Sequence, residues 1–107
     1  MDFADYLREA SPEILWTKVD SAGDYQGEVC AVGVYLDGII IYKGYYGSCS
    51  GCGAWGEGGE PTSLEEVKAS SILYWAKEDA IQAVKDWQGM REGVQKADEY
   101  LDAKETQ

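Results

Sequence analysis

The chain has 107 residues, 45% of them hydrophobic, with 20 acidic residues, nine basic residues, no histidine and a formal net charge of −11. This length predicts a single domain over residues 1–107, and eight Tyr with four Trp exclude a disordered chain. The charge argues against direct binding to nucleic acid, whose backbone needs Lys and Arg, and favours a basic partner.

The N-terminal segment predicts a helix and then a strand. Residues 2–10 carry apolar side chains at helical spacing, and Pro12 should end that helix because the residue before a proline avoids the α region. Residues 13–19 mix β-branched and aromatic side chains and predict a strand. We expect residues 21–24 to form a loop.

The strongest local signal is a hairpin over residues 28–47. Asp37-Gly38 lies between two apolar runs and is typical of a two-residue type I′ turn, which would set Leu36 opposite Ile39 and Cys30 opposite Tyr45. Both faces would be apolar, so we expect the hairpin to lie centrally in a larger sheet with helices on at least one face. One face would carry Cys30, Val32, Val34, Leu36, Ile39, Ile41 and Tyr45, and the other Val29, Ala31, Tyr35, Ile40, Tyr42 and Tyr46.

The C-terminal half predicts helices around one further strand. Thr62 and Ser63 each precede a Glu by three residues, the spacing of a capping box, and Gly89 is a plausible helix stop. No Gly or Pro occurs between Thr62 and Gln88, so one long helix is the alternative. We favour a strand there because the bulky residues 72–75 would wrap around a helix. The expected order is helix 63–70, strand 71–76, helix 77–88 and helix 92–104. The whole pattern predicts an α+β fold: an antiparallel sheet centred on the 28–47 hairpin and packed with N-terminal and C-terminal helices.

The cysteines form the most pointed motif. Cys49 and Cys52 are spaced as C-x-x-C and followed by Gly53, the form of a zinc knuckle, with Cys30 as the remaining thiol. A fourth zinc ligand would have to be a carboxylate such as Glu57 or come from a second chain, so a four-thiolate site across a homodimer is one hypothesis. A small thiol-redox protein is a second hypothesis, and two turn cysteines without metal or cofactor are the third.

Nothing in the sequence indicates an enzyme. The absence of His excludes hydrolase triads built on it, and Glu57 and Glu60 in the Gly-rich segment would repel phosphates. Paired carboxylates such as Glu65 and Glu66 are typical of a solvated helix surface. We therefore expect a non-enzymatic protein.

The aromatic and acidic residues suggest a contact surface for another protein, because Tyr and Trp are enriched at interface hot spots. No apolar run reaches the length of a membrane span and no export signal is present, which favours the cytoplasm and no membrane contact. The predicted partner-binding residues are Tyr45, Tyr46, Trp55, Glu57, Glu60, Glu65 and Glu66.

Two short motifs carry a resemblance. Residues 24–27, DYQG, and residues 46–52, YGSCSGC, resemble a group of small acidic phage-encoded proteins, and residues 71–80 match a later segment of that group loosely. The chain departs from the group at Gly53, where Asp is usual, and in its last helix. The group has no established activity, so the resemblance implies a viral protein in the host cytoplasm. Together with the charge, it suggests occupation of a basic, nucleic-acid-binding site on a host protein, as in counter-defence (anti-CRISPR-like) inhibitors or nucleic-acid mimics.

Overall fold

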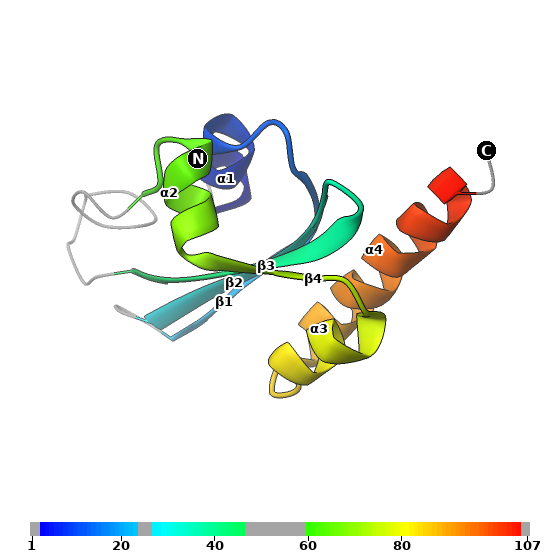
Figure 1. The fold of residues 1–107 in the computed structure, drawn as a ribbon. Coiled ribbons are helices and arrows are strands. Elements are labelled where there is room, and N and C mark those ends of the chain that lie inside the picture. The colour runs from blue at the N-terminus through cyan, green and yellow to red at the C-terminus, as the bar shows by residue number, and fades with distance from the viewer. Residues whose placement is uncertain (1–2, 24–26, 47–59, 106–107) are drawn as a thin grey trace.

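The computed structural model describes residues 3–23, 27–46 and 60–105, which form an α+β fold with helices on both faces of an antiparallel sheet (Figure 1). This confirms the predicted fold class. Trp55, Glu57 and the predicted cysteine pair at 49 and 52 lie outside the described residues. The elements are α1 (Phe3–Ala10), β1 (Leu15–Gly23), β2 (Gly27–Tyr35), β3 (Gly38–Tyr46), α2 (Leu64–Ala69), β4 (Ser71–Tyr74), α3 (Lys77–Ala83) and α4 (Gln88–Glu105).

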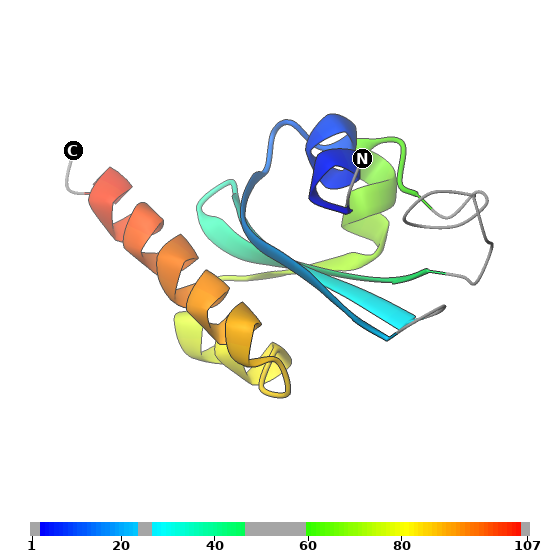
Figure 2. The ribbon, with the colours of Figure 1, turned by 180° about the vertical axis from the view of Figure 1, so that it is seen from behind.

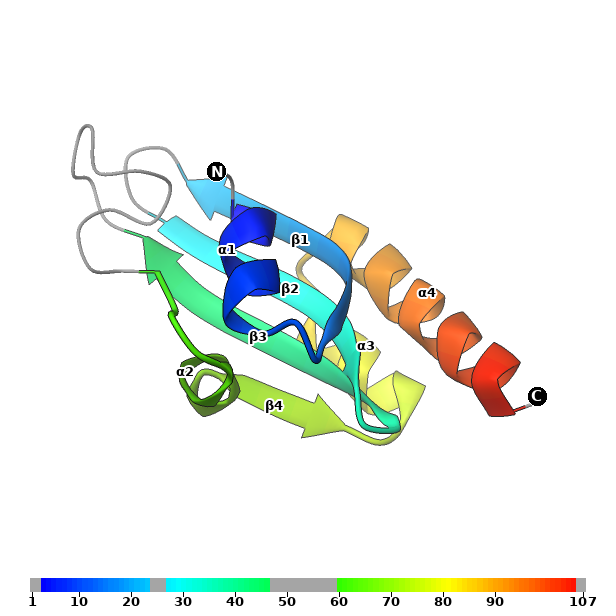
Figure 3. The same ribbon diagram turned by 90° about the horizontal axis from the view of Figure 1, so that it is seen from above.

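The four strands follow one another across the sheet in the order β1-β2-β3-β4, and every pair is antiparallel. The predicted hairpin, β2 with β3, therefore occupies the centre. Helices α1 and α2 cover one face, and α3 and α4 cover the other (Figures 1 and 2). Seen from above, β1 and β4 form the two edges of the sheet (Figure 3).

Two apolar cores separate these layers, because both faces of the central hairpin are hydrophobic. The face under α1 and α2 buries Leu7, Ala10, Ile14, Trp16, Val29, Ala31, Ile40, Tyr42 and Val67. The opposite face buries Cys30, Val32, Val34, Ile39, Ile41, Ala80, Val84, Met90, Val94 and Ala97. The predicted division of the hairpin side chains between two faces is thus confirmed for its buried members.

The predicted register of the hairpin is wrong by two residues. The turn is Leu36-Asp37, flanked by the pair Tyr35 and Gly38, and Leu36 takes the positive φ of 56°. Gly38 lies in β3 instead, where an added Cβ would meet Leu73 Cδ1 and Tyr74 O at 3.0 Å each. The glycine is therefore needed for close contact with β4 rather than for the turn. A shift of two leaves each side chain on its predicted face, because the alternation has a period of two.

Three predicted boundaries also differ. Strand β1 continues to Gly23, so residues 21–23 pair with β2 instead of forming a loop. Strand β4 ends at Tyr74, and it separates α2 from α3, which rules out the single long helix. Gly89 does not end a helix but lies in the first turn of α4; the break comes earlier, after Ala83.

The start of α2 follows the capping prediction. The Ser63 side chain accepts a hydrogen bond from the Glu66 backbone N–H, and the Glu66 carboxylate accepts from the backbone N–H and hydroxyl of Thr62. The reciprocal carboxylate bond thus reaches one residue further back than in a standard capping box. Among the described helices, none is long and apolar enough to cross a membrane.

Candidate functional site

The layer formed by α1, α2 and their flanking residues is predominantly acidic. Residues 3–14 and 60–70 contain six carboxylates and two basic side chains. The carboxylates are Asp5, Glu9, Glu13, Glu60, Glu65 and Glu66.

Both basic side chains of this layer already have partners. Arg8 Nη1 lies 3.6 Å from Asp5 Oδ1, and Lys68 Nζ lies 5.7 Å from the centre of the Tyr35 ring. Even with both positive charges counted, four of the six carboxylates have no counter-charge within this layer. Such an uncompensated surface favours approach of a positively charged molecule.

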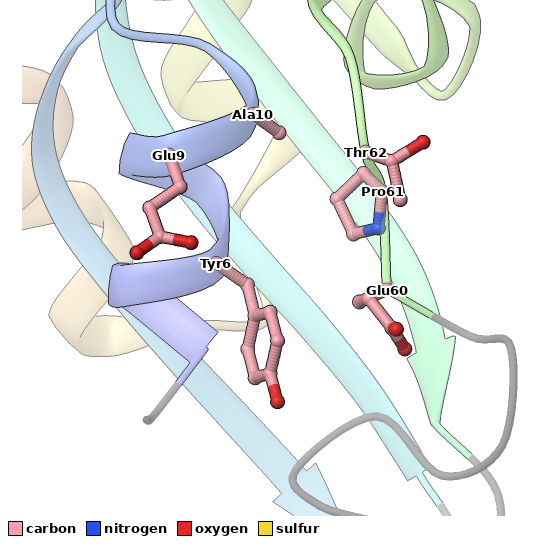
Figure 4. A pocket seen from close by; sticks show the side chains of 6 residues that line it. All are labelled: Tyr6, Glu9, Ala10, Glu60, Pro61 and Thr62. Carbon is pink, nitrogen blue, oxygen red and sulfur yellow. The ribbon is translucent and has the colours of Figure 1, made fainter.

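A pocket of about 340 Å³ opens between α1 and the segment that leads into α2. One wall is α1, with Tyr6, Glu9 and Ala10, and the facing wall is Glu60, Pro61 and Thr62 (Figure 4). Among the described residues, two carboxylates and one phenol ring line the pocket, and no basic side chain does. A cation with an apolar stem fits this chemistry, because a ring face and carboxylates both attract positive charge.

The wall opposite α1 is held by the cap of α2. Glu66 Oε2 lies 2.6 Å from Thr62 N and 2.9 Å from Thr62 Oγ1. Hydrogen bonds from the Thr62 backbone and hydroxyl lower the pKa of the Glu66 carboxyl below its usual value. Glu66 therefore stays ionised and anchors Thr62, which lines the pocket directly, while Pro61 beside it is buried.

The structure groups only part of the predicted partner surface. Glu60 lines the pocket, while Glu65 and Glu66 lie exposed on α2, so these three share one side of the molecule. Tyr45 and Tyr46 are neighbours in β3 and point to opposite faces of the sheet. Tyr46 packs against Phe3 with ring centres 5.2 Å apart, which makes it a core contact of the α1 layer.

Tyr45 is the more exposed tyrosine, at 75%. It stands opposite Glu28 across the β2–β3 ladder. Both residues border a hollow of about 400 Å³ together with Gly27 and Tyr46, at the end of the sheet. The described residues that border this hollow are not among those that line the acidic pocket, so the predicted surface residues fall into two groups.

Cys30 is set deep in the sheet. It is 1% exposed and pairs with Lys43 rather than Tyr45, which moves it two residues farther from position 49 along the ladder than expected. Burial raises the pKa of its thiol to about 11. Metal ligation and redox attack both need the thiolate, so the setting of Cys30 does not favour either. Within residues 3–23, 27–46 and 60–105, no three side chains of the metal-ligating types gather in one place.

Sequence reasoning missed Tyr6 and Glu9 as site residues. Their spacing of three places both on one side of α1, which is a usable local signal. The other wall comes from Glu60, more than fifty positions later, and only the packing of α1 beside α2 brings the two together.

Comparison of the chain with protein families, with curated proteins and with solved structures finds no match.

Proposed function

We propose that this chain is a non-enzymatic binding protein whose acidic α1–α2 layer docks onto a basic partner protein. The observation that carries the proposal is the pocket between α1 and residues 60–62, in which Glu9, Glu60 and Tyr6 are joined by no basic side chain of the described residues. The pocket would accept one Lys or Arg side chain of the partner. The surrounding carboxylates would orient the approach.

The chemistry of the pocket suits a long basic side chain. Its volume falls at the lower end of the roughly 300–1,000 Å³ typical of ligand pockets. Lys and Arg carry an apolar stem and a charged head, so the stem can lie along Pro61 and Ala10 while the head meets a carboxylate. The Tyr6 ring offers a further favourable surface to a cation.

The net charge of the protein supports binding to a whole basic surface of the partner, in addition to the one basic side chain in the pocket. At −11 on 107 residues, the protein attracts basic surfaces over a distance set by ionic strength. Proteins that bind nucleic acid present such basic surfaces. A partner of this kind would lose access to nucleic acid while the chain occupies it, which makes the chain an inhibitor or nucleic-acid mimic.

A peptide titration tests the pocket. An arginine-containing peptide and its citrulline analogue, which has the same shape without charge, are added to labelled protein and followed by NMR. We expect shift changes concentrated at Tyr6, Glu9 and residues 60–62 with the arginine peptide alone, weakening as salt is raised. Equal responses to both peptides, or changes spread over α3 and α4, contradict the proposal.

Two variants with the same change in charge separate the pocket from net charge. Glu9→Gln with Glu60→Gln removes both pocket carboxylates, whereas Glu78→Gln with Asp79→Asn removes two exposed carboxylates from α3. We expect the first pair to weaken binding at least about tenfold, as for a lost charge-assisted contact. The second pair should weaken it by less than about threefold. An equal loss in both shows that only net charge matters.

Capture then extends the test to protein partners. Immobilised wild type and both double variants are exposed to a host-cell fraction enriched in nucleic-acid-binding proteins. A partner that uses the pocket is retained by wild type and by the α3 variant, is lost with the pocket variant, and is released by added DNA. If a partner is retained equally at low and high salt, and equally by wild type and the pocket variant, the result contradicts the proposal.

A further inference from the structure

A second, smaller cavity lies at the C-terminal end of α2. It has a volume of about 90 Å³ and is lined by Tyr35, Ile40, Lys68, Ser71 and Leu73. The acidic pocket instead includes Pro61 and Thr62, which precede α2, and the two cavities share no lining residue. They therefore lie at opposite ends of the same short helix.

The floor of this cavity is apolar. Ile40 and Leu73 are direct neighbours across the β3–β4 ladder. Ile40 is buried in the core beneath α1 and α2, and Leu73 and the Tyr35 ring pack against that core. A ligand that contacts this floor gains free energy by burying an apolar group of its own.

The passage from α2 into β4 leaves Lys68 as the charged group of the lining. A single residue separates the end of α2 from Ser71, the first residue of β4. The Ser71 hydroxyl donates to the Val67 carbonyl in the last turn of α2, so its hydrogen is already used. Among the described residues that line the cavity, Lys68 alone is charged.

The Lys68 ammonium keeps its charge for a ligand. Its Nζ lies 5.7 Å from the centre of the Tyr35 ring, and it forms no ion pair with any carboxylate of the described residues. The Glu66 carboxylate, two positions earlier in α2, is hydrogen-bonded to Thr62 at the other end of the helix. A ring face attracts an ammonium without neutralising it, so Lys68 can still pair with an anion.

We propose that this cavity binds a short aliphatic carboxylate, with the alkyl chain on Ile40 and Leu73 and the carboxylate paired with Lys68. The positive charge at the rim disfavours a cation, and the apolar floor disfavours a small inorganic anion, which would lose its hydration there. The volume limits the size of the ligand. It is below the roughly 150 Å³ of an apolar cavity that holds benzene, so the chain has room for about four or five carbon atoms.

The binding should be weak. The net charge of −11 opposes the approach of any anion, and a ligand of this size has few atoms to contribute. We therefore expect a dissociation constant on the order of millimolar. The acidic pocket takes a ligand of the opposite charge at the other end of α2, so failure of either proposal leaves the other intact.

NMR of protein labelled at the methyl groups of Ile and Leu tests the cavity. The probes, titrated at neutral pH, are 3-methylbutanoate, its uncharged amide 3-methylbutanamide, and acetate. We expect saturable shifts of the Ile40 and Leu73 methyl signals with 3-methylbutanoate, and no saturation with acetate. The amide should bind at least about threefold more weakly, which is the scale of an exposed ion pair. Equal binding of acid and amide, or shifts that do not saturate at Ile40 and Leu73, overturns the proposal.

Two lysine variants separate Lys68 from net charge. Lys68→Met removes the ammonium and keeps an unbranched side chain, so the acid should bind only as weakly as the amide while binding of the amide is unchanged. Unchanged binding of the amide also shows that the cavity is still formed. Lys96→Met removes the same charge from an exposed position of α4 and should preserve the preference for the acid. A preference that survives Lys68→Met, or that Lys96→Met abolishes equally, contradicts the proposal.

The acidic-pocket variant provides a further control. Glu9→Gln with Glu60→Gln changes only residues of the other cavity, so it should leave the saturable shifts at Ile40 and Leu73 in place. If this variant abolishes binding of 3-methylbutanoate, the acid does not bind at the C-terminal end of α2 and the proposal fails.

Discussion

Ser11 shows how one buried hydroxyl joins two elements. It is the fully buried polar residue among the described residues. Its Oγ donates to the Leu7 carbonyl at the end of α1 and accepts from Trp16 Nε1 at 3.2 Å. Because Trp16 belongs to β1, this hydroxyl fixes the angle at which the chain leaves α1, and with it the position of one wall of the acidic pocket.

Replacement of Ser11 by alanine should destabilise the fold by about 1–3 kcal/mol, because the buried Trp16 N–H would lose its acceptor. Urea unfolding measures the change. In a double-mutant cycle with Trp16→Phe, which removes the donor, Ser11→Ala should cost distinctly less. If the cost of Ser11→Ala is the same in both backgrounds, the Trp16 bond contributes nothing.

At the scale of elements, α4 packs closely on β1 because a glycine stands at the contact. A Cβ at Gly93 would lie 2.6 Å from Lys18 Cβ. Beside it, Thr17 Oγ1 lies 2.9 Å from the Gly93 carbonyl and 3.1 Å from the Val32 carbonyl. One side chain at the β1 register shift thus links α4 to the sheet. A Cβ at Gly89, one turn earlier in α4, would meet the end of the Lys18 side chain at 3.3 Å and Asp20 Oδ2 at 3.8 Å.

These two glycines should respond oppositely to alanine. Gly93→Ala should destabilise the protein by about 1–3 kcal/mol, because the backbones of α4 and β1 must separate. Gly89→Ala should be neutral or stabilise by up to about 1 kcal/mol, because alanine favours the helix and the Lys18 tip can move. Paired urea titrations measure both. If Gly93→Ala also stabilised the protein, helix propensity rather than the contact with Lys18 would govern α4.

At the scale of the whole molecule, charge is spread unevenly over three layers. The α1–α2 layer has six carboxylates and two basic side chains, whereas residues 77–105 carry eight acidic and five basic residues. In both helical layers the excess acidic side chains repel one another. The α1–α2 layer has fewer basic side chains to offset this repulsion. The excess negative charge on which the proposed binding of a basic partner rests therefore also opposes the compact state.

Salt should consequently stabilise the fold. Raising ionic strength from about 0.01 M to 0.15 M shortens the screening length from about 30 to 8 Å. We expect the free energy of unfolding in urea to rise by about 1 kcal/mol or less, the scale of surface charge interactions. Glu9→Gln with Glu60→Gln should show a smaller rise. A fall in stability with salt would instead mean that attractive ion pairs dominate the surface.

Most elements of the fold could be predicted from the sequence, but only part of the candidate site could be. Local rules predict the helix before Pro12, the cap at Ser63 and a short strand over residues 71–76. The structure contains all three, with the strand ending at Tyr74. The acidic pocket does not follow from local rules, because the residues of its two walls are far apart in the sequence. Glu60 was predicted for its charge, but nothing near it in sequence indicates Tyr6.

What the sequence determined by itself is each side chain's face and each helix's apolar stripe, since alternation in strands and helical spacing are local periodicities. Tertiary contact decided the rest. The sequence predicts Gly38 as a turn residue, but in the structure it lies in β3 against β4. The sequence predicts Gly89 as a helix end, but in the structure it lies within α4. Glycine permits both a turn and a close approach, and only the neighbouring element selects between them.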